Sequence, residues 1–104
     1  MKIYWSDFAS EMLASIYKYY KINVSERVAK KIKNEILTST NHFKRNPYSG
    51  SLETNLEELN EGHRYLVEGN YKIIYKEIKE GILITDVFDT RQDPIKINDE
   101  TRLP

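Results

Sequence analysis

The residues with the clearest chemical potential in this 104-residue chain are two arginines, Arg64 and Arg91, at either end of a run of apolar segments. The run, residues 63–94, reads HRYLVEGNYKIIYKEIKEGILITDVFDTRQDP. Its segments are rich in Val, Ile, Tyr and Phe and are separated by Gly69-Asn70 and Glu80-Gly81, which predicts a three-stranded antiparallel meander. Because Arg64 opens the first strand and Arg91 follows the last, we expect their guanidinium groups to be neighbours on one sheet.

Each arginine also has a structural alternative, in which it pairs with Asp86, Asp89 or a backbone carbonyl at the end of the sheet. Groups for metal binding are scarce, because the chain has no cysteine and only two histidines, His42 and His63. No carboxylate accompanies either histidine at ligand spacing. We therefore expect no metal and no cofactor, and a structural role for His63 rather than a catalytic one.

Length and composition indicate a single domain, residues 1–104, in the cytoplasm. The absence of cysteine fits a reducing compartment, and no stretch resembles a signal peptide or a membrane span. The net charge is zero, but residues 1–45 carry an excess of +5, residues 46–62 one of −4 and residues 63–104 one of −1. A neutral total does not favour a protein whose affinity comes mainly from phosphate contacts.

The segments outside the meander show a strand pattern, two amphipathic helix patterns with serine caps, and two polar stretches. The helix patterns are joined by a short turn, which predicts an antiparallel hairpin. The expected fold class is α+β, with this hairpin packed on one face of a mainly antiparallel four-stranded sheet. The expected elements are a strand at Lys2–Trp5, a helix that starts at Ser6 and ends around Lys21 to Val24, a helix from Ser25 to about Arg45, an acidic connector at 46–62 and a tail at 95–104 with a docked turn through Ile95 and Ile97.

Side-chain alternation places apolar groups on both faces of the meander. Two sets are predicted for the middle strand (Tyr71, Ile73 and Tyr75 against Ile74 and Ile78) and two for the last strand (Ile82, Ile84 and Phe88 against Leu83 and Val87). The helical hairpin covers one face, and no further element is predicted to cover the other. An uncovered apolar face of this kind indicates a surface for a partner.

The order of elements and three motifs, RYLV at 64–67, GNYKIIY at 69–75 and VFDTRQ at 87–92, resemble the RelE/ParE superfamily of toxins from bacterial type II toxin–antitoxin systems. The resemblance covers Lys2 to about Ile97. It implies a growth-inhibiting, plasmid-stabilising toxin that a cognate antitoxin neutralises. It leaves the target open, because one branch cleaves messenger RNA in the ribosomal A site and the other poisons DNA gyrase without being a nuclease.

For the nuclease branch, the resemblance implies that Arg64 and Arg91 are catalytic and hold phosphates, while the acid/base group stays unassigned. The segment after Arg91 contains neither Tyr nor His, and Asp89 stands where some members carry a basic residue. These departures favour gyrase poisoning, with ribosome-dependent cleavage or a non-toxic binding protein as alternatives. Glu57, Glu58, Tyr71 and Tyr75 remain open as substitute acid/base groups, and the residues expected to bind target or antitoxin are Arg64, Tyr71, Ile73, Tyr75, Phe88, Asp89 and Arg91.

Overall fold

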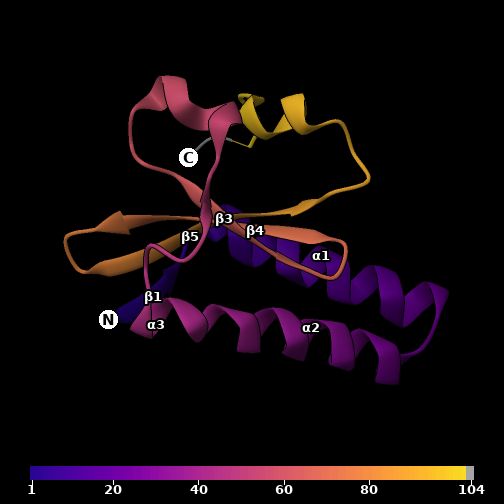
Figure 1. Cartoon of the computed structure of the whole chain (residues 1–104). Coiled ribbons are helices and arrows are strands. Elements are labelled where there is room, and N and C mark those ends of the chain that lie inside the picture. Colours follow the sequence, from indigo (N-terminus) through magenta and orange to yellow (C-terminus); the bar gives the residue numbers. More distant parts are fainter. Residues whose placement is uncertain (103–104) are drawn as a thin grey trace.

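A computed structural model describes residues 1–102 as a sheet with helices on both sides (Figure 1). The strand order is β1-β5-β4-β3-β2, with β1 parallel to β5 and the other neighbours antiparallel. The predicted α+β class and meander are confirmed, but the sheet has five strands because a two-residue strand pairs with the start of β3. The strands are β1 Lys2–Trp5, β2 Ser51–Leu52, β3 Arg64–Glu68, β4 Tyr71–Ile78 and β5 Gly81–Asp89.

The helical hairpin consists of α1, Asp7–Asn23, and α2, Glu26–Thr40, and both start at serine caps. The Ser6 and Ser25 hydroxyl oxygens each accept a backbone N–H from three residues further on, at 3.1 Å. Such caps satisfy amide groups that the first turn of a helix leaves unpaired, which explains why both helices begin where the sequence predicts.

The second helix does not continue unbroken to Arg45 as predicted. It ends at Thr40, and a separate single turn, α3 His42–Arg45, follows. The hydroxyls of Ser39 and Thr40 donate to backbone carbonyls three residues earlier, at 2.6 and 2.7 Å. Side-chain bonds of this kind compete with the helical ladder, so consecutive Ser and Thr residues favour an end at this position.

The alternation along β5 changes phase at Thr85, which sequence reasoning did not anticipate. Tyr75 pairs with Ile84 whereas its neighbour Ile74 pairs with Asp86, so Thr85 is an extra residue in β5. A bulge of this kind moves all later side chains to the opposite face. The prediction that Phe88 shares a face with Ile84 is therefore wrong.

The apolar residues form two cores, one on each side of the sheet. The larger core lies under the hairpin and includes Leu13, Ile36, Ile73, Tyr75 and Val87. The hairpin packs on this face in Figure 1, as predicted. The second core lies on the reverse face and consists of Leu56, Ile74, Phe88 and Ile97, with Tyr65 packed against it.

The prediction of an uncovered reverse face is wrong, because the connector and the tail cover it. Two 3₁₀ helices, η1 Thr54–Leu59 and η2 Pro94–Asn98, lie side by side over the sheet on the side away from the hairpin (Figure 1). Leu56 of η1 and Ile97 of η2 are buried there. The connector and tail lack a helical period, so the sequence indicates loops where the structure has short covering elements.

The C-terminal segment is anchored at two points rather than hanging free. Ile97 is buried as predicted, but Ile95 is exposed. The Arg102 guanidinium donates to both Asp86 carboxylate oxygens, at 2.7 and 3.0 Å, and lies over the rings of Phe8 and Phe88. Residues 103–104 of the predicted tail lie outside the described part. Among the helices of residues 1–102, none has the length and apolar character of a membrane span.

Candidate functional site

Arg64 and Arg91 do not lie close together, so the prediction that their guanidinium groups are neighbours is wrong. Arg64 is paired with Tyr75 on β4, whereas Asp89, which holds Arg91, is paired with Tyr71. Tyr71 and Tyr75 are four residues apart, or about 13 Å along the strand. Two strand spacings also separate β3 from β5 across the sheet. The guanidinium groups of Arg64 and Arg91 therefore do not converge on a site for one phosphate.

Arg64 holds the loop that enters the sheet. Its guanidinium donates to the Gly50 carbonyl at 2.8 Å and lies over the Tyr48 ring. The Tyr75 hydroxyl supports the same loop, because it accepts the Gly50 N–H and donates to the Pro47 carbonyl, both at 2.9 Å. The structural alternative, pairing with a backbone carbonyl, thus describes the contact that Arg64 makes.

Four of the residues expected to contact a partner are buried in the described structure. Tyr71, Ile73 and Tyr75 lie under the hairpin, and Phe88 lies in the reverse core. Burial leaves little of these four side chains for a partner to contact, although Tyr71 also lines a cavity beside α1, and their proposed roles in binding stay predictions. Arg64 and Asp89 are partly exposed and Arg91 is exposed, so their proposed roles in binding stay predictions.

Asp89 and Arg91 line a cavity of about 370 Å³ between α1 and the end of β5. The Arg91 guanidinium donates hydrogen bonds to both carboxylate oxygens of Asp89, at 2.7 and 2.9 Å. The backbone N–H of Arg91 donates to the same carboxylate. The apolar wall comes from α1, through Met12 and Ile16. Sequence reasoning missed the part that α1 plays, since its residues show only the pattern of a core-facing helix.

Three titratable groups that line this cavity, Asp89, Arg91 and Tyr71, have pKa values shifted further from neutral pH. Hydrogen bonding to Arg91 lowers the pKa of Asp89, and the same carboxylate raises the pKa of Arg91. Burial, and then the hydrogen bond to the Tyr20 hydroxyl at 3.2 Å, raises the pKa of Tyr71. Because efficient proton transfer needs a pKa near the working pH, the arrangement suits binding rather than acid–base catalysis.

His63 is no better placed for proton transfer. It is only 4% exposed, and its Nδ1 atom has no hydrogen-bond partner within the described residues. Burial lowers the pKa of His63, and the charge of Lys76 lowers it further, against opposing effects of Glu61 and Glu53. Glu57 and Glu58, two of the substitute acid/base groups, are exposed on η1. The expectation of a structural His63 therefore agrees with its burial.

The neutral, buried state of His63 makes folding stability depend on pH. Below the ordinary histidine pKa of about 6.5 the unfolded chain binds a proton that the folded chain does not, so stability falls as pH drops below that value. Urea unfolding from pH 7.5 to 5 should show this loss, up to about 1.4 kcal/mol per pH unit. His63→Leu should remove this contribution, and His42→Leu, at an exposed position, should retain it. Equal pH profiles for wild type and His63→Leu would contradict the assignment.

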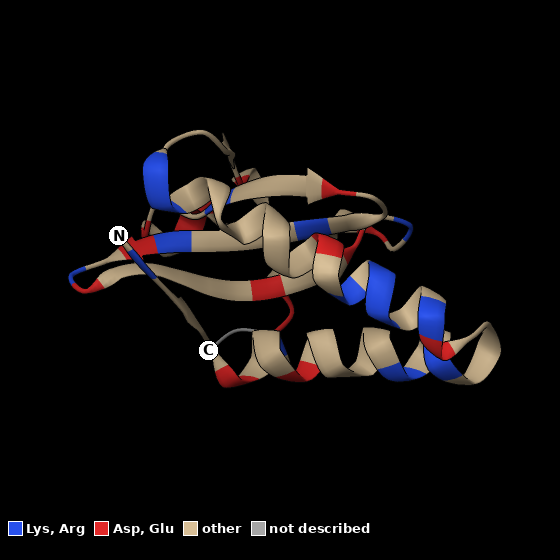
Figure 2. Cartoon of the chain, turned by 90° about the horizontal axis from the view of Figure 1, so that it is seen from below, with Lys and Arg blue, Asp and Glu red and all other residues tan. Residues whose placement is uncertain are grey.

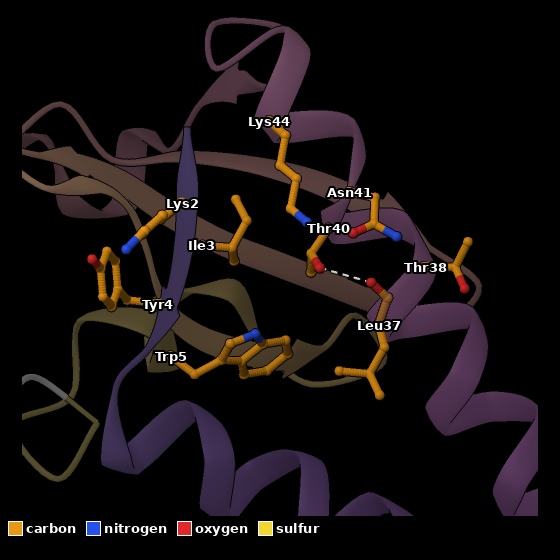
Figure 3. Close-up of a pocket in the computed structure, with 9 residues that line it drawn as sticks. All are labelled: Lys2, Ile3, Tyr4, Trp5, Leu37, Thr38, Thr40, Asn41 and Lys44. Atoms are coloured by element: carbon orange, nitrogen blue, oxygen red, sulfur yellow. Dashed lines mark hydrogen bonds between the residues drawn. The ribbon is translucent and has the colours of Figure 1, made fainter.

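A second hollow, of about 520 Å³, runs between β1 and the end of α2 (Figure 3). Trp5 and Leu37 form its apolar end, and the Lys44 side chain extends into it towards Thr40. In the sheet formed by residues 1–102, β1 is an edge strand with β5 as its single neighbour. The hollow therefore combines an open strand edge with an apolar and a cationic contact.

No strand within residues 1–102 pairs with the outer side of β1. The Ser6 N–H donates to the Ile84 carbonyl at 2.9 Å, so alternation directs the amide groups of Lys2 and Tyr4 towards β5 as well. The N–H and C=O groups of Ile3 and Trp5 then point to the opposite edge. An edge of this kind is a template for an added strand.

Comparison with solved structures identifies the fold of this chain. The chain superposes on a chain of the chromosomal ParDE toxin–antitoxin system from P. aeruginosa with a TM-score of 0.70 and 18% identity, over 86% of this chain and 95% of that one. The fold is therefore ParE-like. The family model for the ParE toxin of the type II toxin–antitoxin system parDE matches residues 3–94, and the chain belongs to this family. A search among curated protein sequences finds no match.

Proposed function

We propose that this chain is the toxin of a type II toxin–antitoxin module, that it acts in the cytoplasm by poisoning DNA gyrase, and that a cognate antitoxin neutralises it. The observation that carries the proposal is the family match over residues 3–94. The choice of gyrase over messenger RNA cleavage is supported by the site, since cleavage needs cations and an acid/base group around one phosphate. Arg64 and Arg91 do not converge, and His63 is buried.

A growth experiment tests the toxin assignment. Expression of the chain alone in bacteria should arrest growth, and co-expression of a cognate antitoxin should restore it. Normal growth from a product verified as folded would favour the non-toxic binding protein instead. With purified components, accumulation of gyrase-trapped DNA breaks is the expected result. Codon-phased cuts in translated message, without trapped breaks, would assign the chain to the nuclease branch.

The cavity that holds Arg91 is proposed as the contact for the target. Arg91→Ala removes an exposed cation and should lower gyrase trapping by about tenfold, which corresponds to about 1.4 kcal/mol of binding free energy. Its ion pair with Asp89 is largely exposed, so the fold should persist and circular dichroism should be unchanged. Arg45→Ala, at an exposed cation of α3, is the control. Undiminished trapping by Arg91→Ala would reject this contact.

The hollow beside β1 is proposed as a docking place for the antitoxin. An extended segment that pairs with the outer edge of β1 would place a carboxylate within reach of Lys44 and an apolar side chain near Trp5 and Leu37. Lys44→Glu should therefore weaken antitoxin binding by about tenfold in calorimetry, because it brings like charges together. Arg45→Glu, the adjacent residue outside the hollow, should bind normally. Equal affinity for both variants would place the antitoxin elsewhere.

A further inference from the structure

The turn of the helical hairpin carries a local positive charge that the neutral total conceals. Residues 18–33 contain six Lys or Arg and one Asp or Glu, an excess of five, which equals the whole excess of residues 1–45. In Figure 2 the cationic bands gather over the half of the hairpin nearest its turn, and the acidic bands of α1 lie at its other end. All six cations are exposed: Lys18, Lys21, Arg27, Lys30, Lys31 and Lys33.

Few of these charges are compensated by contacts among the residues that the structure describes. Lys30 lies 3.5 Å from Glu26 in a largely exposed ion pair, a geometry that contributes little energy. Lys33 lies over the Tyr17 ring, which leaves its charge in place. The part of the acidic connector that forms η1, with Glu57 and Glu58, lies on the far side of the sheet from the hairpin (Figure 1). Charges beyond the Debye length of about 8 Å are largely screened, so the connector does not neutralise this tip.

The shape of the hairpin tip, residues 18–33, favours binding to an extended polyanion over binding to an acidic pocket of a folded protein. The turn projects past the end of the sheet, so the cations surround a convex end (Figure 1). Two large apolar side chains at this end, Ile22 and Val24, are 69% and 59% exposed. A convex cationic end reaches the regular phosphate rows of a duplex, where lysines act as point charges and need no fixed hydrogen-bond geometry.

We infer that the hairpin tip, residues 18–33, binds the phosphate backbone of duplex DNA without reading its sequence. If the proposed function holds, this contact places the toxin against the DNA that gyrase carries, and this part of the inference rests on that function. DNA binding by the chain alone does not depend on it. Affinity should be modest and strongly salt-dependent, because neutralised phosphates release counterions.

Fluorescence anisotropy with a labelled duplex of arbitrary sequence tests the inference. The full chain should bind at low salt, and raising the salt from 50 to 200 mM should weaken binding by about 100-fold if four phosphates are neutralised. Arg27→Gln/Lys30→Gln/Lys31→Gln should lower affinity by at least about tenfold and reduce the slope of log K against log salt by about three. Glutamine has a helix propensity close to that of Lys and Arg, so α2 should persist.

The matched control is Arg45→Gln/Lys79→Gln/Lys96→Gln, which removes one arginine and two lysines at exposed positions away from the tip. This control should keep both the affinity and the salt slope. Equal losses in the two variants would indicate diffuse attraction and overturn the inference. It would also be overturned if the tip variant bound DNA normally but lost affinity for the antitoxin, since the tip would then serve an acidic protein.

The gyrase assay separates the two proposals. If both hold, the tip variant should need at least about tenfold more protein than the control variant to trap DNA breaks at 150 mM salt. DNA binding lost in the tip variant, with no trapping even by the wild type, would support the DNA contact and reject the gyrase target. Trapping by the wild type with no measurable DNA binding at 50 mM salt would reject the DNA contact and keep the target.

Discussion

Arg102→Ala is expected to lower the free energy of unfolding by about 3–5 kcal/mol, the cost of leaving a buried carboxylate without its partner. The side chains of Arg102 and Asp86 are only 16% and 6% exposed. The guanidinium also packs over the rings of Phe8 and Phe88, about 5 Å from each. Urea unfolding at pH 7 measures the loss, and a loss below 1 kcal/mol would show that water replaces the guanidinium.

A double variant separates the ion pair from the packing. Burial raises the pKa of Asp86, and Arg102 only partly offsets this effect, so taking the carboxylate out of water costs more than the pairing returns. Asp86→Asn/Arg102→Met removes both charges and keeps most of the volume. It should therefore recover most of the stability that Arg102→Ala loses. If the double variant were as unstable as Arg102→Ala, the lost unfolding free energy would come from the packing of the guanidinium over the rings of Phe8 and Phe88.

Phe88→Ala should also cost about 3–5 kcal/mol of unfolding free energy, because it leaves a cavity at the centre of the reverse core. Phe88 is 1% exposed and packs with Leu56, Ile74 and Ile97. Hydrogen exchange should rise in η1 and η2 more than in α1, since only the reverse core is emptied. Val67→Ala, at an exposed position of β3, should stay within about 0.5 kcal/mol of wild type. Uniform exchange across both layers would contradict the existence of two separate cores.

The parts of the fold that depend on local rules could be read from the sequence. Serine caps fixed the starts of both long helices, and Gly69, with a φ of 58°, supplied the tight turn between β3 and β4. Gly81 closes the next turn at a φ of 151°, a backbone conformation that residues with a side chain rarely adopt. These features act within a few residues, so their chemistry is visible in one chain.

The parts that depend on distant contacts could not be read in the same way. The extra residue at Thr85 becomes visible only when β5 is aligned with β4, and it alone decides which face Phe88 occupies. The covering role of Leu56 and Ile97 has no periodic signal, because each stands in a polar segment. For the candidate site, the sequence identified Asp89 and Arg91, but not the wall that α1 provides.

The pairing of β1 with β5 has a consequence for how the protein is made. These strands join residues that are 79 positions apart, as the contact from Ser6 to Thr85 shows. A nascent chain leaves the ribosome from its N-terminus, so β1 has no neighbour until β5 has emerged. Arg102 can pair with Asp86 only after all five strands have emerged. A chain from which β5 has not yet emerged therefore lacks the finished sheet and exposes both edges of β1.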